Sequence, residues 1–307
     1  MATDRITTLA GTSDNHLRYG IEVARSGDPP NSLEQSLMAL FVTARYAPVM
    51  SRTICSCIML LSITAPAVAA GCAFAPQGEG RVTDIIDARS FRLQDGRDVS
   101  LIGIEPASTA DTKANRAAAL AAIIAGRDVT LRGDDDTPDR YGRQPAFVFL
   151  DSPDTSEQVS VQAALLAQGA ALVAATVTDK DCAATLAAAE ATARLAKRGI
   201  WADPAVIKNT ESPGDILAGI GRFMLVEGKV LSVRQAGATT YLNFGRNWTR
   251  DFAVTIPKRM IAVFEAAGIV LKSLENRRIR VRGWVEARGG PRIEALRVGQ
   301  IELLGEN

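Results

Sequence analysis

The sequence predicts a mainly β protein with interspersed helices, organised as two successive small β-barrels. Short strand-like runs separated by turn signals occur in both halves of the chain, and Ala-rich helical segments lie between them. A segment rich in Pro, Asn and Ser, taken as residues 204–219, is expected to link a first domain at 73–203 to a second at 220–305. The 307 residues, 47% of them hydrophobic, suffice for two ordinary domains.

The first half is expected to contain three strands, a helix, two strands and two helices. The Asp95-Gly96 pair is a turn signal, and Gly126 and Gly169 follow helical stretches, as is common at helix C-termini. Asp181 is a candidate N-cap for the last helix. Short strands around a helix are typical of a small barrel. The expected elements are strands at 82–86, 90–93, 99–104, 128–132 and 146–150, and helices at 111–125, 159–168 and 182–198.

The second half is expected to contain five strands with a helix between the third and the fourth. This is the element order of an OB-type barrel. The expected strands are 223–233, 239–244, 252–256, 277–287 and 292–296, with the helix at 258–267.

The N-terminal region has the features of an export signal. Residues 50–71 begin with a short basic stretch, continue as an apolar run and end in small residues, which is the pattern of a cleavable signal peptide. The alternative is a membrane span, but the run is shorter than the ~20 residues that a span needs. A signal starting at Met50 makes residues 1–49 a probable upstream extension, disordered or mis-started. The mature protein is therefore expected in the periplasm or secreted, without a transmembrane segment.

Two cysteines, Cys72 and Cys182, follow the expected cleavage site. An even pair in an oxidising compartment favours a disulfide. The alternative is a lipoprotein anchored through Cys72, because residues 69–72 are similar to a lipobox with Ala69 at the usual Leu position.

Five ordered segments between residues 80 and 201 resemble the staphylococcal nuclease (thermonuclease) family. This resemblance implies a five-stranded OB barrel with three helices, and active members are calcium-dependent phosphodiesterases. The segments are Gly80–Leu93, Val99–Pro106, Asp139-Arg140-Tyr141-Gly142-Arg143, Val161–Ala171 and Glu190–Trp201.

The resemblance also implies where metal ligands should lie. The first carboxylate of the family's opening hairpin matches Asp87, but the next metal ligand falls on Arg89. The following metal carboxylate falls on Glu105, which is longer than the usual Asp. A calcium ion requires oxygen ligands, and Arg89 instead places a cation where the dication should bind. We expect Arg89 to pair with Glu105.

The remaining catalytic positions are largely replaced. The general-base Glu falls on Ser108 and one phosphate-binding Arg on Ser100, whereas the other matches Arg143. The only His, His16, precedes the expected signal and could not activate Ser108 in the mature protein. A degenerate, non-catalytic or weakly active nuclease with a binding or envelope role is expected, and no cofactor.

An active phosphodiesterase acting on DNA or RNA is the alternative. In that case Arg143, Glu105 and Asp87 would have altered roles, and calcium would be required. A shift in register could also bring Asp111 or the run 134–136 towards the site, although that run is more simply a solvated loop.

The two halves differ in charge. Residues 73–212 hold 15 Lys and Arg against 20 Asp and Glu, and residues 213–307 hold 15 against 9, although the whole chain has a net charge of only +1. In the basic half, Arg278, Arg280, Arg282 and Trp284 alternate with apolar residues and should share one face of a strand. Such a face suits single-stranded nucleic acid or another anionic polymer of the envelope. The alternative is a solvated outer face with Trp284 packed by arginine stems.

Overall fold

The structure is a computed structural model that describes residues 72, 74–106, 113–151 and 158–305. These residues all belong to one compact unit, Ala65–Asn307. The expected extension at 1–49 and the expected signal at 50–71 lie outside the described residues. In the described part of the chain, no helix has the length and apolar character needed to cross a membrane.

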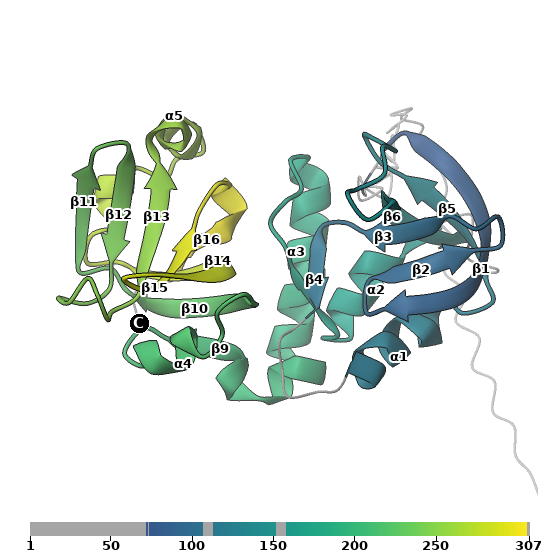
Figure 1. Cartoon of the computed structure of the whole chain (residues 1–307), viewed down its shortest axis with the longest axis horizontal. Coiled ribbons are helices and arrows are strands. Elements are labelled where there is room, and N and C mark those ends of the chain that lie inside the picture. Colours follow the sequence, from purple (N-terminus) through teal and green to yellow (C-terminus); the bar gives the residue numbers. More distant parts are fainter. Residues whose placement is uncertain (1–71, 73, 107–112, 152–157, 306–307) are drawn as a thin grey trace, which may run out of the picture. The chain divides into compact units, whose positions relative to one another are not determined.

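Five strands of the first half close into a barrel (Figure 1). Antiparallel pairing runs from β3 through β2 and β1 to β5 and β6, and the parallel pairing of β3 with β6 closes the ring. The mainly β fold with a small closed barrel is thus confirmed. The strands are β1 (Pro76–Asp87), β2 (Ser90–Leu93), β3 (Asp98–Leu101), β5 (Asp128–Arg132) and β6 (Arg143–Asp151).

Apolar side chains from these strands fill the barrel. Phe91, Val99, Leu101 and Leu131 each have no measurable exposure. The strand expected at 99–104 is divided at Gly103, whose φ of 81° favours glycine and whose missing Cβ leaves room for Val177 and Leu186. The chain therefore leaves the barrel after β3 and forms a separate two-stranded pair, β4 (Ile104–Pro106) with β8 (Ala171–Val173).

Three helices accompany the first barrel: α1 (Lys113–Ile124), α2 (Val161–Ala167) and α3 (Lys180–Leu195). The start of the helix expected at 159–168 is instead strand β7 (Gln158–Ser160). The expected cap of α3, Asp181, lies inside the helix, and Asp179 caps it by accepting a 2.7 Å hydrogen bond from the amide of Cys182. The observed cap therefore lies two residues earlier than the cap that the sequence pattern suggested.

The second half forms one sheet of eight strands. β10 and β11 are separated only by residues 230 and 231, so the pairing order β11-β12-β13-β15-β14-β10 returns to the same stretch of chain. Helix α5 (Lys258–Ala266) lies between β13 and β14 in sequence. The strands are β9 (Ile207–Asn209), β10 (Phe223–Lys229), β11 (Ser232–Ala236), β12 (Thr239–Asn243), β13 (Ala253–Pro257), β14 (Arg278–Arg288), β15 (Gly290–Glu294) and β16 (Ile301–Leu303).

Part of the expected linker has regular structure. Within residues 204–219, β9 pairs in parallel with β10, and α4 (Pro213–Leu217) buries Ile216 in the core of the second sheet. Pro and Ser in this segment therefore mark the start of a short helix and not an unstructured connection. The four short 3₁₀ helices of the described residues are η1 (Gly199–Ala202), η2 (Pro204–Val206), η3 (Leu271–Leu274) and η4 (Val298–Gln300).

Candidate functional site

The hairpin between β1 and β2 holds the first residues of the candidate site. The Asp87 carboxylate accepts a 2.9 Å hydrogen bond from the backbone amide of Arg89, which fixes the turn. The Arg89 guanidinium then reaches β4, where its Nη1 lies 2.9 Å from Oε1 of Glu105. The ion pair expected between Arg89 and Glu105 is confirmed.

Glu105 is the less accessible partner, with 12% of its side chain exposed against 29% for Arg89. Burial raises the pKa of Glu105, and the charge and hydrogen bond of Arg89 oppose this rise only in part. The Arg89 guanidinium thus supplies the positive charge that balances this partly buried carboxylate.

Arg143, at the start of β6, is held by its own loop. Its Nε and Nη2 lie 3.0 and 2.9 Å from Oδ2 of Asp139. Its Nη1 donates to Oγ of Ser90 at 3.2 Å and lies 4.0 Å from Oδ2 of Asp87. Only 18% of the Arg143 side chain is exposed, so the guanidinium that could bind phosphate is already engaged by carboxylates.

The loop around Arg143 is organised by Asp139. Its Oδ1 accepts the backbone amides of Tyr141 at 2.8 Å and Arg143 at 3.1 Å. Burial raises the pKa of Asp139, but these hydrogen bonds and the charge of Arg143 outweigh it and lower the pKa. Tyr141 is 67% exposed, and the guanidinium carbons of Arg140 and Arg143 lie 4.8 and 5.0 Å from its ring centroid.

The two serines of the sequence prediction, Ser100 and Ser108, carry no charge. Ser100 is buried on β3, paired in register with Ser90 of β2. Ser108 and the alternative carboxylate Asp111 lie outside the described residues. Asp134–Asp136 lie in the exposed loop between β5 and β6.

The donor set does not fit a calcium ion. Calcium takes six to eight oxygen ligands, whereas Arg89 is bonded to Glu105 and Arg143 lies close to Asp87. Within the described residues, no group of three or more His, Cys, Asp or Glu side chains is positioned to hold a metal. Glu105 and Asp139 each form a close ion pair with a guanidinium group, and Asp87 lies 4.0 Å from Arg143.

The alternating residues of β14 do not form an open cationic face. Arg278 and Trp284 are exposed, but Arg280 and Arg282 are only 8% and 7% exposed. The expectation of one solvent-facing row is therefore wrong for its two central residues, because acidic side chains from distant segments cover them. Whether this strand binds nucleic acid stays a prediction.

Arg282 connects the second sheet to α3 of the first half. Its Nη1 and Nη2 lie 3.0 and 2.9 Å from the two carboxylate oxygens of Glu190, and Nη1 also donates to the carbonyl of Val173 at 3.0 Å. Arg280 pairs with Glu227 of β10 and lies 2.8 Å from Glu302 of β16.

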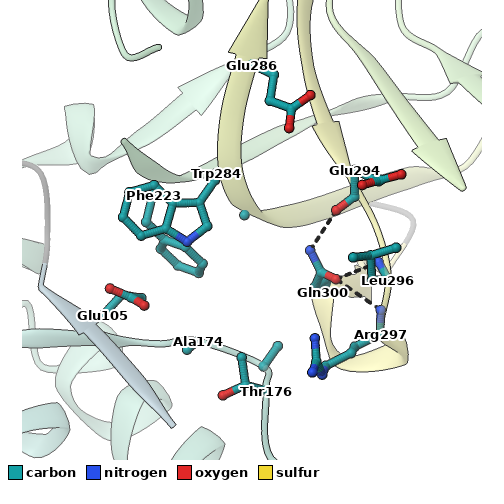
Figure 2. A pocket seen from close by; sticks show the side chains of 12 residues that line it. Glu105, Ala174, Thr176, Phe223, Trp284, Glu286, Glu294, Leu296, Arg297 and Gln300 are labelled. Carbon is teal, nitrogen blue, oxygen red and sulfur yellow. Dashed lines mark hydrogen bonds between the residues drawn. The ribbon is translucent and has the colours of Figure 1, made fainter. Parts of the chain in front are cut away.

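A cavity of about 210 Å³, which the sequence patterns did not predict, is lined by residues from both halves of the chain. Glu105 and Thr176 line it from the first half, and Phe223, Trp284 and Glu294 from the second (Figure 2). The sequence pattern predicts only that Trp284 shares a strand face with the arginines of β14. Nothing local in the sequence indicates that Glu105 faces the same space.

The predicted disulfide between Cys72 and Cys182 is present, with an S–S distance of 1.99 Å. It joins the start of the described chain to the first turn of α3, and both cysteines are buried. The disulfide occupies the thiol that the alternative, lipid attachment at Cys72, would need.

The segments that follow α2 and α3 contact each other closely at two glycines. Gly169, after α2, and Gly199, after α3, approach so closely that a Cβ on either would overlap the backbone of the other segment. The amide of Ile200 donates to the carbonyl of Gly169 at 3.0 Å. Both have positive φ, so glycine is required at each.

With this arrangement, residues 99–203 match the family described as Staphylococcal nuclease homologue. The chain contains a staphylococcal nuclease domain. A comparison with curated protein sequences gave no match. The match includes Glu105 and the loop around Arg143, whereas Asp87 and Arg89 precede it in the sequence.

Proposed function

We propose that this chain is an exported, non-catalytic relative of the thermonucleases that acts by binding at the cell envelope. The observation that carries the proposal is the 2.9 Å ion pair between Arg89 and Glu105. It places a fixed positive charge among the carboxylates that would otherwise attract a dication.

The chemistry of phosphodiester hydrolysis supports the same conclusion. The reaction needs a base for water and concentrated positive charge on the developing phosphorane. Ser100 is uncharged and buried, and Arg143 is engaged by Asp139. Ser108 offers no carboxylate at the base position. The residues that remain hold one another in place and leave little to stabilise a phosphorane.

The alternative is an active calcium-dependent phosphodiesterase that uses Arg143, Glu105 and Asp87 in changed roles. It would require calcium to displace Arg89 from Glu105, or another group near Ser108 in the sequence to supply a base. A second alternative, binding of single-stranded nucleic acid by the second sheet, must now rely on Arg278 and Trp284, which are the exposed residues of the row.

A cleavage assay separates these functions. The full chain is incubated with end-labelled single-stranded DNA in calcium or in chelator, beside the variants Arg143→Ala and Arg140→Ala. Arg140 is exposed in the same loop and serves as the matched control. We expect no calcium-dependent cleavage by any of the three. Cleavage that requires calcium, disappears in Arg143→Ala and persists in Arg140→Ala would establish the active alternative.

A calcium titration tests the reason for inactivity. Arg89→Asp removes the cation and adds a carboxylate beside Asp87 and Glu105, so this variant should bind calcium more tightly than the unaltered chain. Equal calcium affinity of the two proteins would show that Arg89 does not govern the site.

Nucleic-acid binding by the second sheet is tested by a salt titration. A phosphate-driven mode requires an affinity that falls as salt increases. Affinity for a single-stranded oligonucleotide that is unaffected by salt, or by Arg278→Glu, would remove this alternative.

A further inference from the structure

The cavity between β4 and β14 has an aromatic wall. Trp284 is 52% exposed, although its cross-strand partner Phe223 is 4% exposed. The two rings meet edge to face with centroids 6.1 Å apart, which fixes the indole against the sheet. Figure 2 shows Trp284 between Glu286 and Glu105 in this view. The accessible indole of Trp284, fixed by the buried ring of Phe223, can therefore stack against a ligand.

Carboxylates dominate the charge around this aromatic wall. Glu105, Glu286 and Glu294 line the cavity, against a single cation, Arg297. Glu286 lies 3.4 Å from Arg292 in an exposed pair, which is a weak interaction in water. Within the described residues, the Glu294 carboxylate makes no ion pair. The lining therefore holds three carboxylates against one cation, but Arg89 and Arg292 pair with Glu105 and Glu286, so among the described residues Glu294 offers the unpaired carboxylate.

The polar amide in the cavity wall is already saturated. Oε1 of Gln300 accepts the backbone amides of Leu296 and Arg297 at 2.8 and 3.0 Å. Its Nε2 donates to the carbonyls of Arg282 and Glu294 at 3.2 and 3.1 Å. Gln300 thus stabilises the cavity wall, and both N–H groups of its amide already donate to backbone carbonyls.

The volume limits the size of the ligand. About 210 Å³ is below the roughly 300–1,000 Å³ of pockets that enclose drug-sized molecules. The cavity is therefore large enough for a single side chain or a small free amine, but not for a drug-sized molecule.

We propose that this cavity binds an organic cation, an alkylammonium or guanidinium group, over Trp284 and between the carboxylates of Glu105 and Glu294. Cations are attracted to the face of an indole, and the attraction grows where water is partly excluded. The surrounding carboxylates add charge-assisted hydrogen bonds. A lysine or arginine side chain of a peptide and a free amine share this chemistry. The site goes beyond the proposed function and is compatible with either presence or absence of cleavage.

Calorimetric titration of the full chain at low ionic strength tests the site. The probes are tetramethylammonium, L-arginine amide and tetralysine, with inorganic phosphate and a short oligothymidylate as anionic probes. We expect saturable binding of the cations in the low-millimolar range or tighter and none of the anions. Tighter binding of tetralysine than of the two small cations would identify a peptide as the source, and the reverse would identify a free amine.

Matched variants locate the binding. Trp284→Ala should weaken cation binding roughly tenfold and Glu294→Gln roughly threefold. The controls are Trp248→Ala and Glu265→Gln, which alter exposed residues outside the cavity lining and should leave affinity unchanged. Trp284→Phe keeps an aromatic ring and should retain most of the affinity.

Three outcomes would overturn the proposal. One is the absence of saturable binding by all three cations. Another is binding that survives Trp284→Ala in a protein that still unfolds cooperatively. The third is saturable oligothymidylate binding that Trp284→Ala abolishes, which would assign the cavity to nucleic acid.

Discussion

Replacing Arg282 with Met should destabilise the protein strongly, because it leaves a buried carboxylate without its partner. Arg282 and Glu190 are 7% and 2% exposed, and two hydrogen bonds of 3.0 and 2.9 Å join them. Removing one member of a buried ion pair typically costs about 3–5 kcal/mol. Glu190 would keep the hydrogen bond that its Oε2 accepts from the amide of Val173 at 2.6 Å. We therefore expect Arg282→Met to lower the free energy of unfolding by about 3 kcal/mol, the lower end of this range.

The double variant Arg282→Met, Glu190→Gln isolates the charge. The Gln side chain can still accept from Val173, and no buried charge remains. Replacing both partners of such a pair is often close to neutral. We expect the double variant to regain most of the loss, with a coupling energy of about 2 kcal/mol between the two positions.

Urea unfolding at neutral pH provides the measurement. The free energies and slopes are compared for both single variants, the double variant and Arg278→Met, an exposed arginine earlier on the same strand. The free energy of unfolding of the Arg278→Met control should lie within about 0.5 kcal/mol of the value for the unaltered chain. If Arg282→Met lowers the free energy of unfolding no more than the control does, Glu190 is solvated without Arg282 and the reasoning from burial is refuted.

Three further changes test the neighbouring parts of the molecule. Replacing Cys72 and Cys182 with Ser should lower stability by about 2–4 kcal/mol in urea unfolding, because the disulfide closes a loop with a sequence separation of 110 residues. Asp139→Asn should be destabilising at neutral pH, and its deficit should vanish as pH falls well below 3.8, because the lowered pKa of Asp139 contributes stability only while the carboxylate is ionised. Arg89→Met should raise the pKa of Glu105 further, as followed by NMR titration of the carboxyl carbon, because burial already raises it and Arg89 opposes that rise.

Local patterns predicted the first barrel well. Strands at 90–93 and 128–132 have the expected bounds, because alternating side chains and flanking turn signals both act over a few residues. The ion pair of Arg89 with Glu105 was also predictable once both residues were assigned to one site. The division at Gly103 was not predicted, since it depends on Val177 and Leu186, which come from much later in the chain.

The second half shows the limit of pattern reasoning. The period of two along β14 correctly separates Arg280 and Arg282 from apolar neighbours, but it cannot show what covers their face. Their partners Glu190 and Glu302 lie 92 residues before Arg282 and 22 residues after Arg280. A row of buried arginines and a row of exposed arginines have the same sequence pattern. Only tertiary structure distinguishes them.

Charge balance explains why retention of the Arg143 loop does not imply retention of phosphate binding. Around Arg143, the described side chains include the carboxylates of Asp87, Glu105 and Asp139 and the guanidinium groups of Arg89 and Arg143. Arg89 and Arg143 each pair with a carboxylate, so neither guanidinium is free to stabilise a transition state and the paired carboxylates are less able to bind the metal ion that would supply positive charge. Glu105 also lines the neighbouring cavity, where further carboxylates and Trp284 favour a cation. The paired charges around Arg143 therefore favour neither a metal ion nor an anionic substrate, and the cation that we propose at Trp284 is the better candidate for a ligand.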